Sequence, residues 1–254
     1  MVISRNARSD ILNLLVNMVE GKVRKYKRET TAAPFHERLF GSDRYESFSF
    51  VQSLNTSLGM SIWEQIAVVI ANDSGAYAER QYRLEGLINQ EADDYIKSYI
   101  KNLLNNRISA NKDDETRVIR QIIAPGAVKY PNEVVDLFVR FGEQEEYIDM
   151  TSAKPNRKEF QALKEKLLYW TSMRLSSDPN AIVITRLGIP YNPYEPEPYF
   201  RWTGTDFFDL SAGEILVGRD FWNHIGQDNI YDELLDIFEE AGKHTRESLG
   251  KHGY

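Results

Sequence analysis

The sequence contains no cysteine and only four histidines among 254 residues. The absence of cysteine excludes disulfide frameworks and thiolate metal sites. The histidines are scattered along the chain and show none of the spacings typical of metal-binding histidines. We therefore expect any bound metal to be held by carboxylate and carbonyl oxygens, which suit hard ions such as Mg²⁺ or Mn²⁺.

Long apolar runs are also missing: no stretch approaches the ~18 residues that a membrane-spanning helix needs, and the N-terminus lacks a secretion-signal pattern. We expect a cytoplasmic protein without a membrane partner. The formal charge of -7, from 38 acidic and 31 basic residues, argues against a protein that coats nucleic acid indiscriminately. No phosphate-binding G-x-x-x-x-G-K-[ST] motif is present, so nothing indicates ATP-driven translocation.

The first half of the chain has the periodicity of helices. Apolar residues three and four apart predict a helix from Asp10 into Gly21 or slightly beyond. Ser61, with Glu64 three residues later, has the pattern of a capping box that starts a second helix. A third helical pattern covers residues 79–106. The basic run at residues 22–28, which includes Lys25, has two interpretations: contact with phosphates or a solvated helix end.

The second half predicts a small sheet. Residues 133–141 and 147–152, separated by an acidic turn, have the pattern of a β-hairpin. A helix is predicted from Arg157, followed by a buried strand at residues 181–187. The last predicted helix covers residues 231–240, and we expect the final dozen residues to fray.

These elements predict an α/β (α+β) fold formed by one domain, residues 1–254. In this fold, a helical N-terminal part (about residues 1–110) packs on a small mixed β-sheet (about residues 111–240). The 42% content of hydrophobic residues is enough for a large core.

Two carboxylates lie on the predicted hairpin, Asp136 in its first arm and Asp149 in its second. Asp136 is flanked by Val135 and Leu137 in an apolar strand, where a buried carboxylate costs several kcal/mol unless it is paired or binds a metal. It either binds metal or has a structural role, such as pairing with Arg140. Asp149 is followed by Lys154. Two carboxylates and a lysine are what metal-assisted phosphodiester hydrolysis requires, because the metal activates water and the lysine offsets developing negative charge.

Longer runs around these residues, in order along the chain, resemble the catalytic core of type II restriction endonucleases. The runs are Val134-Val135-Asp136, Tyr147-Ile148-Asp149 and Thr151-Ser152-Ala153-Lys154-Pro155-Asn156. Further segments, over roughly residues 55–240, are similar to the TdeIII-like group of the PD-(D/E)xK nuclease superfamily. These segments include Leu58 to Glu64, Pro190 to Tyr194 and Gly218 to Trp222. The resemblance implies a restriction-endonuclease-like core with Asp136 as first metal ligand and Asp149 as the acidic residue of the second strand.

The lysine departs from the family pattern, because a strict D-x-K motif would place it at position 151, which is Thr151. On an ideal strand Lys154 and Asp149 face opposite sides, so a bulge or an early strand end is needed for both to reach one metal. In a variant S-x-K form, the acidic partner comes from the following helix, which offers Glu159 and Glu165. We expect Lys154 to be the catalytic lysine in either form.

A helix glutamate often joins the metal site in this superfamily, which makes Glu64 a third candidate ligand; its alternative role is that of the capping residue. Base reading in the major groove requires Arg, Lys, Asn or Gln. Arg186, Asn192 and Arg201 are the candidates that follow from the predicted elements. Trp202 is either a core residue or a base-stacking platform.

The resemblance implies an Mg²⁺-dependent homodimer that cuts both strands of double-stranded DNA. The expected site is short and near-palindromic, contains GG/CC and has a degenerate centre. It also implies a cognate DNA methyltransferase that protects the host. The alternative is a catalytically inactive DNA-binding or structural protein that keeps the nuclease fold, and Thr151 at the lysine position is the feature that favours it.

Overall fold

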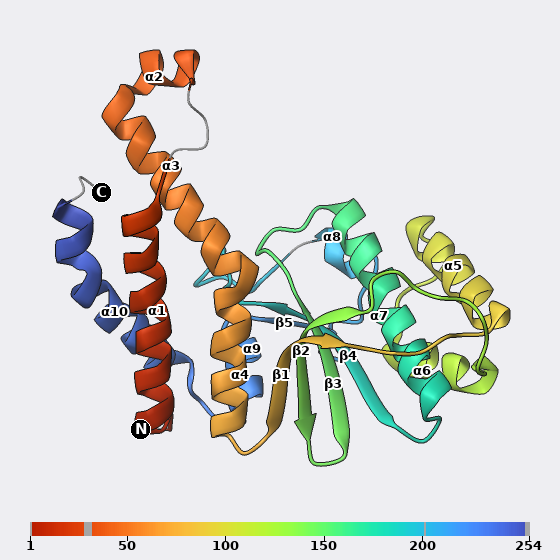
Figure 1. Ribbon diagram of the computed structural model, residues 1–254. Coiled ribbons are helices and arrows are strands. Elements are labelled where there is room, and N and C mark those ends of the chain that lie inside the picture. The colour runs from red at the N-terminus through yellow and green to blue at the C-terminus, as the bar shows by residue number, and fades with distance from the viewer. Residues whose placement is uncertain (1, 28–31, 201, 252–254) are drawn as a thin grey trace.

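The computed structural model describes residues 2–27, 32–200 and 202–251, and its centre is a five-stranded mixed sheet in the order β1-β2-β3-β4-β5 (Figure 1). Strand β2 is antiparallel to both of its neighbours, β1 and β3, whereas β3, β4 and β5 are parallel. The strands are β1 (Tyr77–Arg83), β2 (Val134–Phe141), β3 (Gln144–Met150), β4 (Ile182–Ile189) and β5 (Ile215–Val217).

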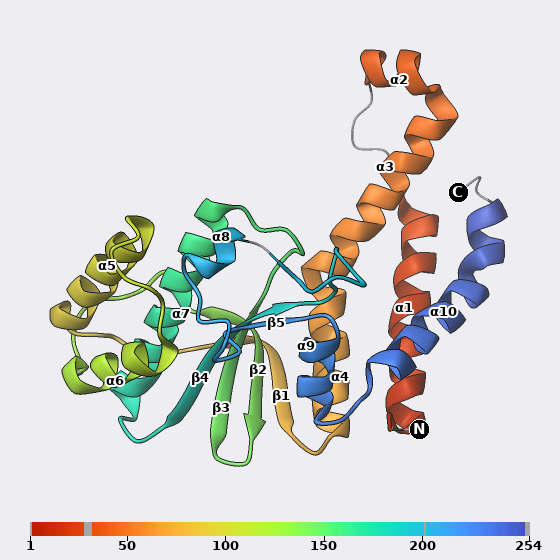
Figure 2. The same ribbon diagram turned by 180° about the vertical axis from the view of Figure 1, so that it is seen from behind.

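Helices cover both faces of the sheet (Figures 1 and 2). On one face pack α5 (Gln90–Leu104), α6 (Lys112–Ile122) and α7 (Arg157–Ser177). On the other pack α1 (Arg5–Lys25), α4 (Trp63–Asp73), α9 (Arg219–Gly226) and α10 (Tyr231–Lys251). The remaining helices are α2 (Pro34–Phe40), α3 (Ser42–Ser57), the π-helical turn η1 (Leu58–Ile62) and α8 (Trp202–Thr205).

Two hydrophobic cores, one on each face, bury the apolar side chains of the central strands on both sides. In β2, Phe138 belongs to the core beneath α5 and α7, and its neighbours Leu137 and Val139 belong to the core beneath α1 and α4. In β3, Tyr147 and Ile148 divide in the same way. Side chains alternate between faces along a strand, so a strand covered on both sides buries consecutive positions, as at residues 137–139 and 146–149.

The predicted fold class is confirmed: helices pack on a small mixed sheet. The hairpin is confirmed as β2 and β3, and the buried strand as β4, but β3 begins at Gln144, inside the predicted acidic turn, and ends at Met150 instead of Ser152. The helix predicted from Arg157 is α7, which begins with a capping box formed by Asn156 and Glu159.

Three local predictions are wrong. Residues 79–106 are not one helix, because Tyr77–Arg83 pairs with β2 as an edge strand and α5 begins only at Gln90. Ser61 does not cap a helix, since α3 continues through the π-helical turn into α4. The chain stays helical up to Lys251 instead of fraying, because α10 packs along α1 and buries Ala241 and Thr245. Residues 252–254 lie outside the described residues.

A buried network of charges holds α7 in place. Lys164 is fully buried and its Nζ donates hydrogen bonds to Glu115 Oε2 and Glu214 Oε1, each at 2.6 Å. Lys112 adds a second buried ammonium, 3.4 Å from Glu214 and 2.6 Å from the Thr185 hydroxyl. Two lysines thus balance two glutamates. Because successive helical residues are about 100° apart, fixing Lys164 also fixes the direction of Lys166, about 200° around the helix.

We predict that Lys164→Met strongly destabilises the protein, because it leaves Glu115 and Glu214 buried with one ammonium between them. Breaking a buried ion pair by removing one partner costs about 3–5 kcal/mol, so the midpoint of urea unfolding should fall clearly. Lys158→Met, at an exposed position of the same helix, is the control and should change stability by no more than about 0.5 kcal/mol. Equal effects of the two substitutions would contradict the assigned role of the network.

Candidate active site

Asp136 and Asp149 meet at one end of the sheet. Asp136 is near the start of β2 and Asp149 near the end of β3, and the two strands are antiparallel. The β2–β3 ladder ends with the pair Leu137↔Ile148, so both aspartates lie just beyond it. Asp136 Oδ2 accepts a hydrogen bond from the Met150 N–H at 2.9 Å, which fixes its carboxylate against β3. The structure therefore brings the two sequence-predicted carboxylates together.

Asp149 is in an electrostatically costly environment. Its side chain is buried, Oδ1 accepts a hydrogen bond from Lys166 Nζ at 2.9 Å, and the buried Oδ2 has no hydrogen-bond partner. Burial raises the pKa of Asp149 to about 7; Lys166 opposes the rise, and the neighbouring Asp136 carboxylate adds to it. The unpartnered oxygen and the raised pKa indicate that Lys166 alone does not compensate the negative charge of Asp149.

Lys166 was missed by the sequence reasoning. It lies in α7, 17 residues after Asp149, and its Nζ also lies 5.1 Å from the centre of the buried Trp170 ring. The local signal is weak: Lys166 is three residues after Leu163 and four before Trp170, but it belongs to the charged run Lys164-Glu165-Lys166, which is typical of the polar side of a helix.

Lys154, the predicted catalytic lysine, follows the end of β3 and is exposed. Its Nζ lies 5.4 Å from the centre of the Tyr194 ring, in the proline-rich segment after β4. Among the described residues, Lys166 is the lysine that contacts Asp149. The two lysines therefore stand in different surroundings, one against a carboxylate and one against an aromatic ring.

The glutamate candidates lie around this centre rather than in it. Glu159 caps α7. Glu165 and Asp149 both add to the rise that burial causes in the pKa of Tyr130, so both carboxylates act on this phenol. Glu64 is buried and accepts hydrogen bonds from Arg80 Nε at 3.2 Å and Gln81 Nε2 at 3.0 Å.

Gln81 connects Glu64 to the catalytic end of β2. The register pairs Arg80 with Leu137 and Tyr82 with Val135, so Gln81 lies opposite Asp136. Its backbone has φ of 53°, in the left-handed region that non-glycine residues rarely adopt. Unusual backbone conformations of this kind gather at functional sites. Through its hydrogen bond with Gln81, Glu64 is thus connected to the strand position opposite Asp136.

The predicted DNA-binding residues are dispersed. Lys25 is exposed in the last turn of α1, where it lines a cavity with Lys22 and Lys27. Arg186 is largely buried and bonds Glu146 and the Gly213 carbonyl. Asn192 closes a local turn, with its side chain bonded to Glu197 O and Tyr194 N. Arg201 lies outside the described residues, and the adjacent Trp202 begins α8.

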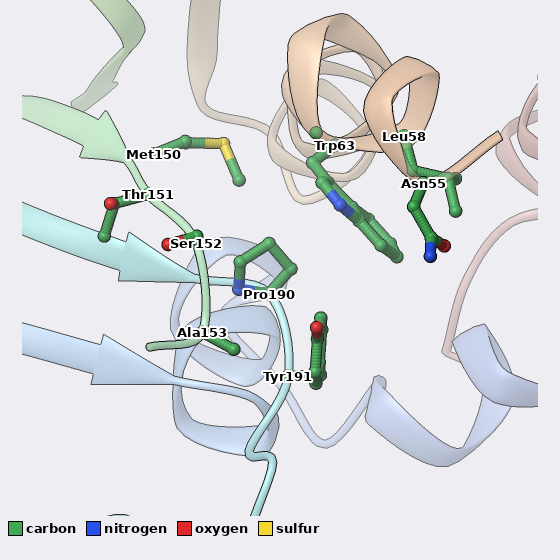
Figure 3. Close-up of a pocket in the computed structure, with 10 residues that line it drawn as sticks. Asn55, Leu58, Trp63, Met150, Thr151, Ser152, Ala153, Pro190 and Tyr191 are labelled. Atoms are coloured by element: carbon green, nitrogen blue, oxygen red, sulfur yellow. The ribbon is translucent and has the colours of Figure 1, made fainter. Parts of the chain in front are cut away.

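A cavity of about 290 Å³ lies beyond the ends of β3 and β4 (Figure 3). It lies where the ends of β3 and β4 approach η1 and the start of α4, and Trp63 and Tyr191 flank it. Met150 and Thr151, which directly follow Asp149, form part of its wall. The cavity lies on the α4 side of the sheet, whereas the side chain of Asp149 contacts Lys166 of α7 on the other side.

The donor chemistry of the site fits a hard divalent cation. Within the described ranges, no three His, Cys, Asp or Glu side chains form a ready-made metal cage. Asp136 and Asp149 nevertheless offer two adjacent carboxylates. The buried Oδ2 of Asp149 accepts no hydrogen bond, so its lone pairs remain for a metal ion. Hard ions such as Mg²⁺ bind one or two carboxylates and keep several water ligands.

Comparison with known proteins identifies the class of this site. The family model described as "Type II restriction endonuclease, HinfI" matches residues 3–242. The chain therefore belongs to the HinfI family of type II restriction endonucleases, which are site-specific deoxyribonucleases. The narrower TdeIII-like assignment stays a prediction.

Individual relatives agree with the family match. The chain is 28% identical over 216 residues to the type II restriction enzyme HgiEI of Herpetosiphon aurantiacus, covering 82% of this chain and 77% of HgiEI. It is 23% identical over 228 residues to the type II restriction enzyme MjaII of Methanocaldococcus jannaschii, covering 82% of this chain and 60% of MjaII. Across the described part of the chain, no helix is both long and apolar enough to cross a membrane.

We predict that Asp149→Asn stabilises the metal-free protein at pH 8. The pKa of Asp149 is raised in the folded state, so wild-type stability falls as the pH rises from the unfolded value of about 4 to about 7, where this carboxyl ionises. Asparagine removes that cost. A gain of only ~1 kcal/mol shifts the melting temperature by about 2–4 °C in a protein of this size.

Melting curves in EDTA at pH 5 and pH 8 measure the effect. The gain should be present at pH 8 and shrink at pH 5, where wild-type Asp149 is protonated. Asp236→Asn, at an exposed position of α10, is the matched control for the loss of one carboxylate. A destabilised Asp149→Asn variant at pH 8 would refute the charge balance described above.

Proposed function

We propose that the protein is an Mg²⁺-dependent endonuclease that hydrolyses one phosphodiester bond in each strand of a short, near-palindromic DNA site. The observation that carries the proposal is the unpartnered, buried Oδ2 of Asp149 beside Asp136, with Lys166 on the opposite oxygen. Burying a carboxylate in this way is costly unless a cation compensates it. Mn²⁺ has the same preference for oxygen ligands and should replace Mg²⁺.

In this proposal Asp136 and Asp149 hold the ion. When bound, Mg²⁺ supplies a water of lowered pKa and offsets the charge on the scissile phosphate. Asp136 is held in its orientation by the Met150 N–H. Lys166 lowers the cost of ionising Asp149, and its remaining N–H groups can orient the attacking water or bind a phosphate oxygen.

The surrounding glutamates have supporting parts in the proposal. Glu64 orders Gln81 opposite Asp136, and it contributes to the metal site only if this contact opens. Glu165 is linked to Asp149 only indirectly, because both carboxylates raise the pKa of Tyr130. We therefore place Asp136, Asp149 and Lys166 in contact with the reacting groups and Glu64 and Glu165 outside that set.

The lysine assignment has a direct test against the sequence-based candidate, Lys154. We expect Lys166→Ala to reduce cleavage at least 100-fold, since it removes the ammonium beside Asp149, while Ca²⁺-supported DNA binding persists. Lys154→Ala should reduce cleavage less than 10-fold. Single-turnover cleavage rates and mobility shifts measure the two effects. The reverse order of the two variants would assign the catalytic role to Lys154.

The target site is a further part of the proposal. A symmetric dimer cutting both strands reads a site with matching two-fold symmetry. The family resemblance of the sequence supports GG/CC ends around a degenerate centre and a host methyltransferase that protects the same site. A cytoplasmic location follows from this role in the host. Digestion of a plasmid of known sequence, with mapping of the cut ends, tests the site.

Thr151 favours a second candidate function, a catalytically inactive DNA-binding protein, because it occupies the motif position of the lysine. Lys166 weakens this alternative, because it supplies an ammonium group to Asp149 from α7. Discrete fragments that appear with Mg²⁺ and disappear with EDTA support the nuclease. A mobility shift without cutting under Mg²⁺ or Mn²⁺ supports the inactive protein.

The basic end of α1 is proposed to contact the DNA backbone through Lys22, Lys25 and Lys27. Each phosphate contact contributes about -0.9 to the slope of log K against log salt concentration. We expect Lys25→Ala to make that slope less steep by about one unit and to weaken binding equally on specific and unrelated duplexes. Lys243→Ala, which removes an exposed lysine paired with Glu239 in α10, is the control and should leave the slope unchanged.

A further inference from the structure

Helices α2 and α3 form an arm (Pro34–Ser57) that projects away from the sheet, as both ribbon views show (Figures 1 and 2). No residue of α2 is buried, and Phe50 is the buried residue of α3. Phe50 contacts the Tyr26 ring just after α1, with ring centroids 5.2 Å apart. The arm is thus held at its C-terminal part, by Phe50 and by the continuation of α3 into η1, and has little core of its own.

Large apolar side chains are exposed along this arm. Their exposed fractions are 84% for Phe35, 75% for Leu39, 52% for Phe40, 62% for Phe48 and 52% for Val51. Phe35 and Leu39 are four residues apart, and Phe48 and Val51 three apart, so each pair shares one helix face. We call these five side chains the apolar arm face.

A helix of seven residues is not stable in water without tertiary contacts. Exposed apolar patches on soluble proteins mark interaction sites. The apolar arm face therefore indicates a surface that is covered when the protein works.

The charges on the arm identify the occupant. The arm has three acidic residues, Glu37, Asp43 and Glu46, and two basic residues, Arg38 and Arg44, for a net charge of -1. A polyanion such as DNA gains nothing from this surface, in contrast to the lysine-rich end of α1. Because the arm carries both signs and almost no net charge, two identical arms can pair opposite charges and do not repel each other strongly, which suits a two-fold contact between identical surfaces.

We propose that the apolar arm face is the dimer interface, and that it packs against the same face of a second copy of this chain. The inference rests on the proposed function in one respect: each chain offers one Asp136–Asp149–Lys166 site, so cutting both strands in a concerted way requires two copies. The arm face supplies the apolar centre of the contact, and the charged residues of the arm form its rim.

The first experiment measures the oligomeric state by sedimentation. Wild-type protein should sediment as a dimer, and Leu39→Glu with Phe48→Glu should weaken self-association at least 100-fold. The matched control is Leu235→Glu, at a position of α10 that is 49% exposed, which should stay dimeric. Equal melting temperatures and circular dichroism of the three proteins show that folding is intact.

The second experiment uses the absence of cysteine. Because the chain contains none, a single Phe48→Cys or Val51→Cys substitution can form a disulfide only with another copy. Mild oxidation should yield covalent dimers of at least one of these variants at low micromolar protein, and none of Leu235→Cys. Monomeric wild-type protein, a dimeric Leu39→Glu/Phe48→Glu variant, or equal cross-linking at position 235 would overturn the proposal.

Cleavage assays separate this proposal from the proposed function. If both hold, Asp136→Ala is dimeric but inactive, and the arm variant loses concerted double-strand cleavage and at most nicks a supercoiled plasmid. A dimeric wild type that never cuts DNA would refute the nuclease function and leave the interface standing. A monomeric wild type that cuts both strands would refute the interface and leave the function standing.

Discussion

The candidate active site depends on the burial of one carboxylate, Asp149, whose two oxygens have different surroundings. Oδ1 is compensated by Lys166, and Oδ2 is left without a partner next to Asp136. A buried carboxylate in a low-dielectric environment repels a second one and attracts a cation, and the rise of its pKa expresses both effects. The fold supplies this arrangement before any ligand is bound, so the free energy stored in the site favours cation binding.

The two-sided sheet is the structural reason that this burial is possible. Because helices cover both faces, the ends of β2 and β3 are shielded from water on both sides. The buried contacts of Lys164 with Glu115 and Glu214 then fix how α7 is rotated, and so which lysine reaches the sheet end. One buried ion cluster, which does not touch the site, positions the ammonium that does.

The sequence allowed the hairpin and its two aspartates to be predicted, because both signals are local. Apolar runs interrupted by single acids, with a turn between them, require no knowledge of distant residues. The lysine could not be derived in the same way, because it reaches Asp149 only through the packing of α7 on β3. Strand β1 was missed for a related reason: its sequence, YAERQYR, is mostly polar, as befits an edge strand, and its hydrogen bonds come from β2. Glu64 has the spacing of a capping residue, but Arg80 and Gln81, which it contacts, are brought near by the sheet.

The proposed role of Lys166 implies that catalysis constrains other parts of the chain than the family motif does. With the ammonium on Lys166, the proposal does not require a lysine at position 151, and Thr151 forms part of the wall of a cavity. The proposal likewise does not require Lys154 at the carboxylates, and its Nζ lies over the Tyr194 ring, in the segment that follows β4. In the proposed mechanism the departure from the D-x-K pattern is a relocation of one charge: the ammonium reaches Asp149 from the helix instead of the strand. A motif written along the sequence does not detect such a relocation, whereas the electrostatic requirement of the buried carboxylate does.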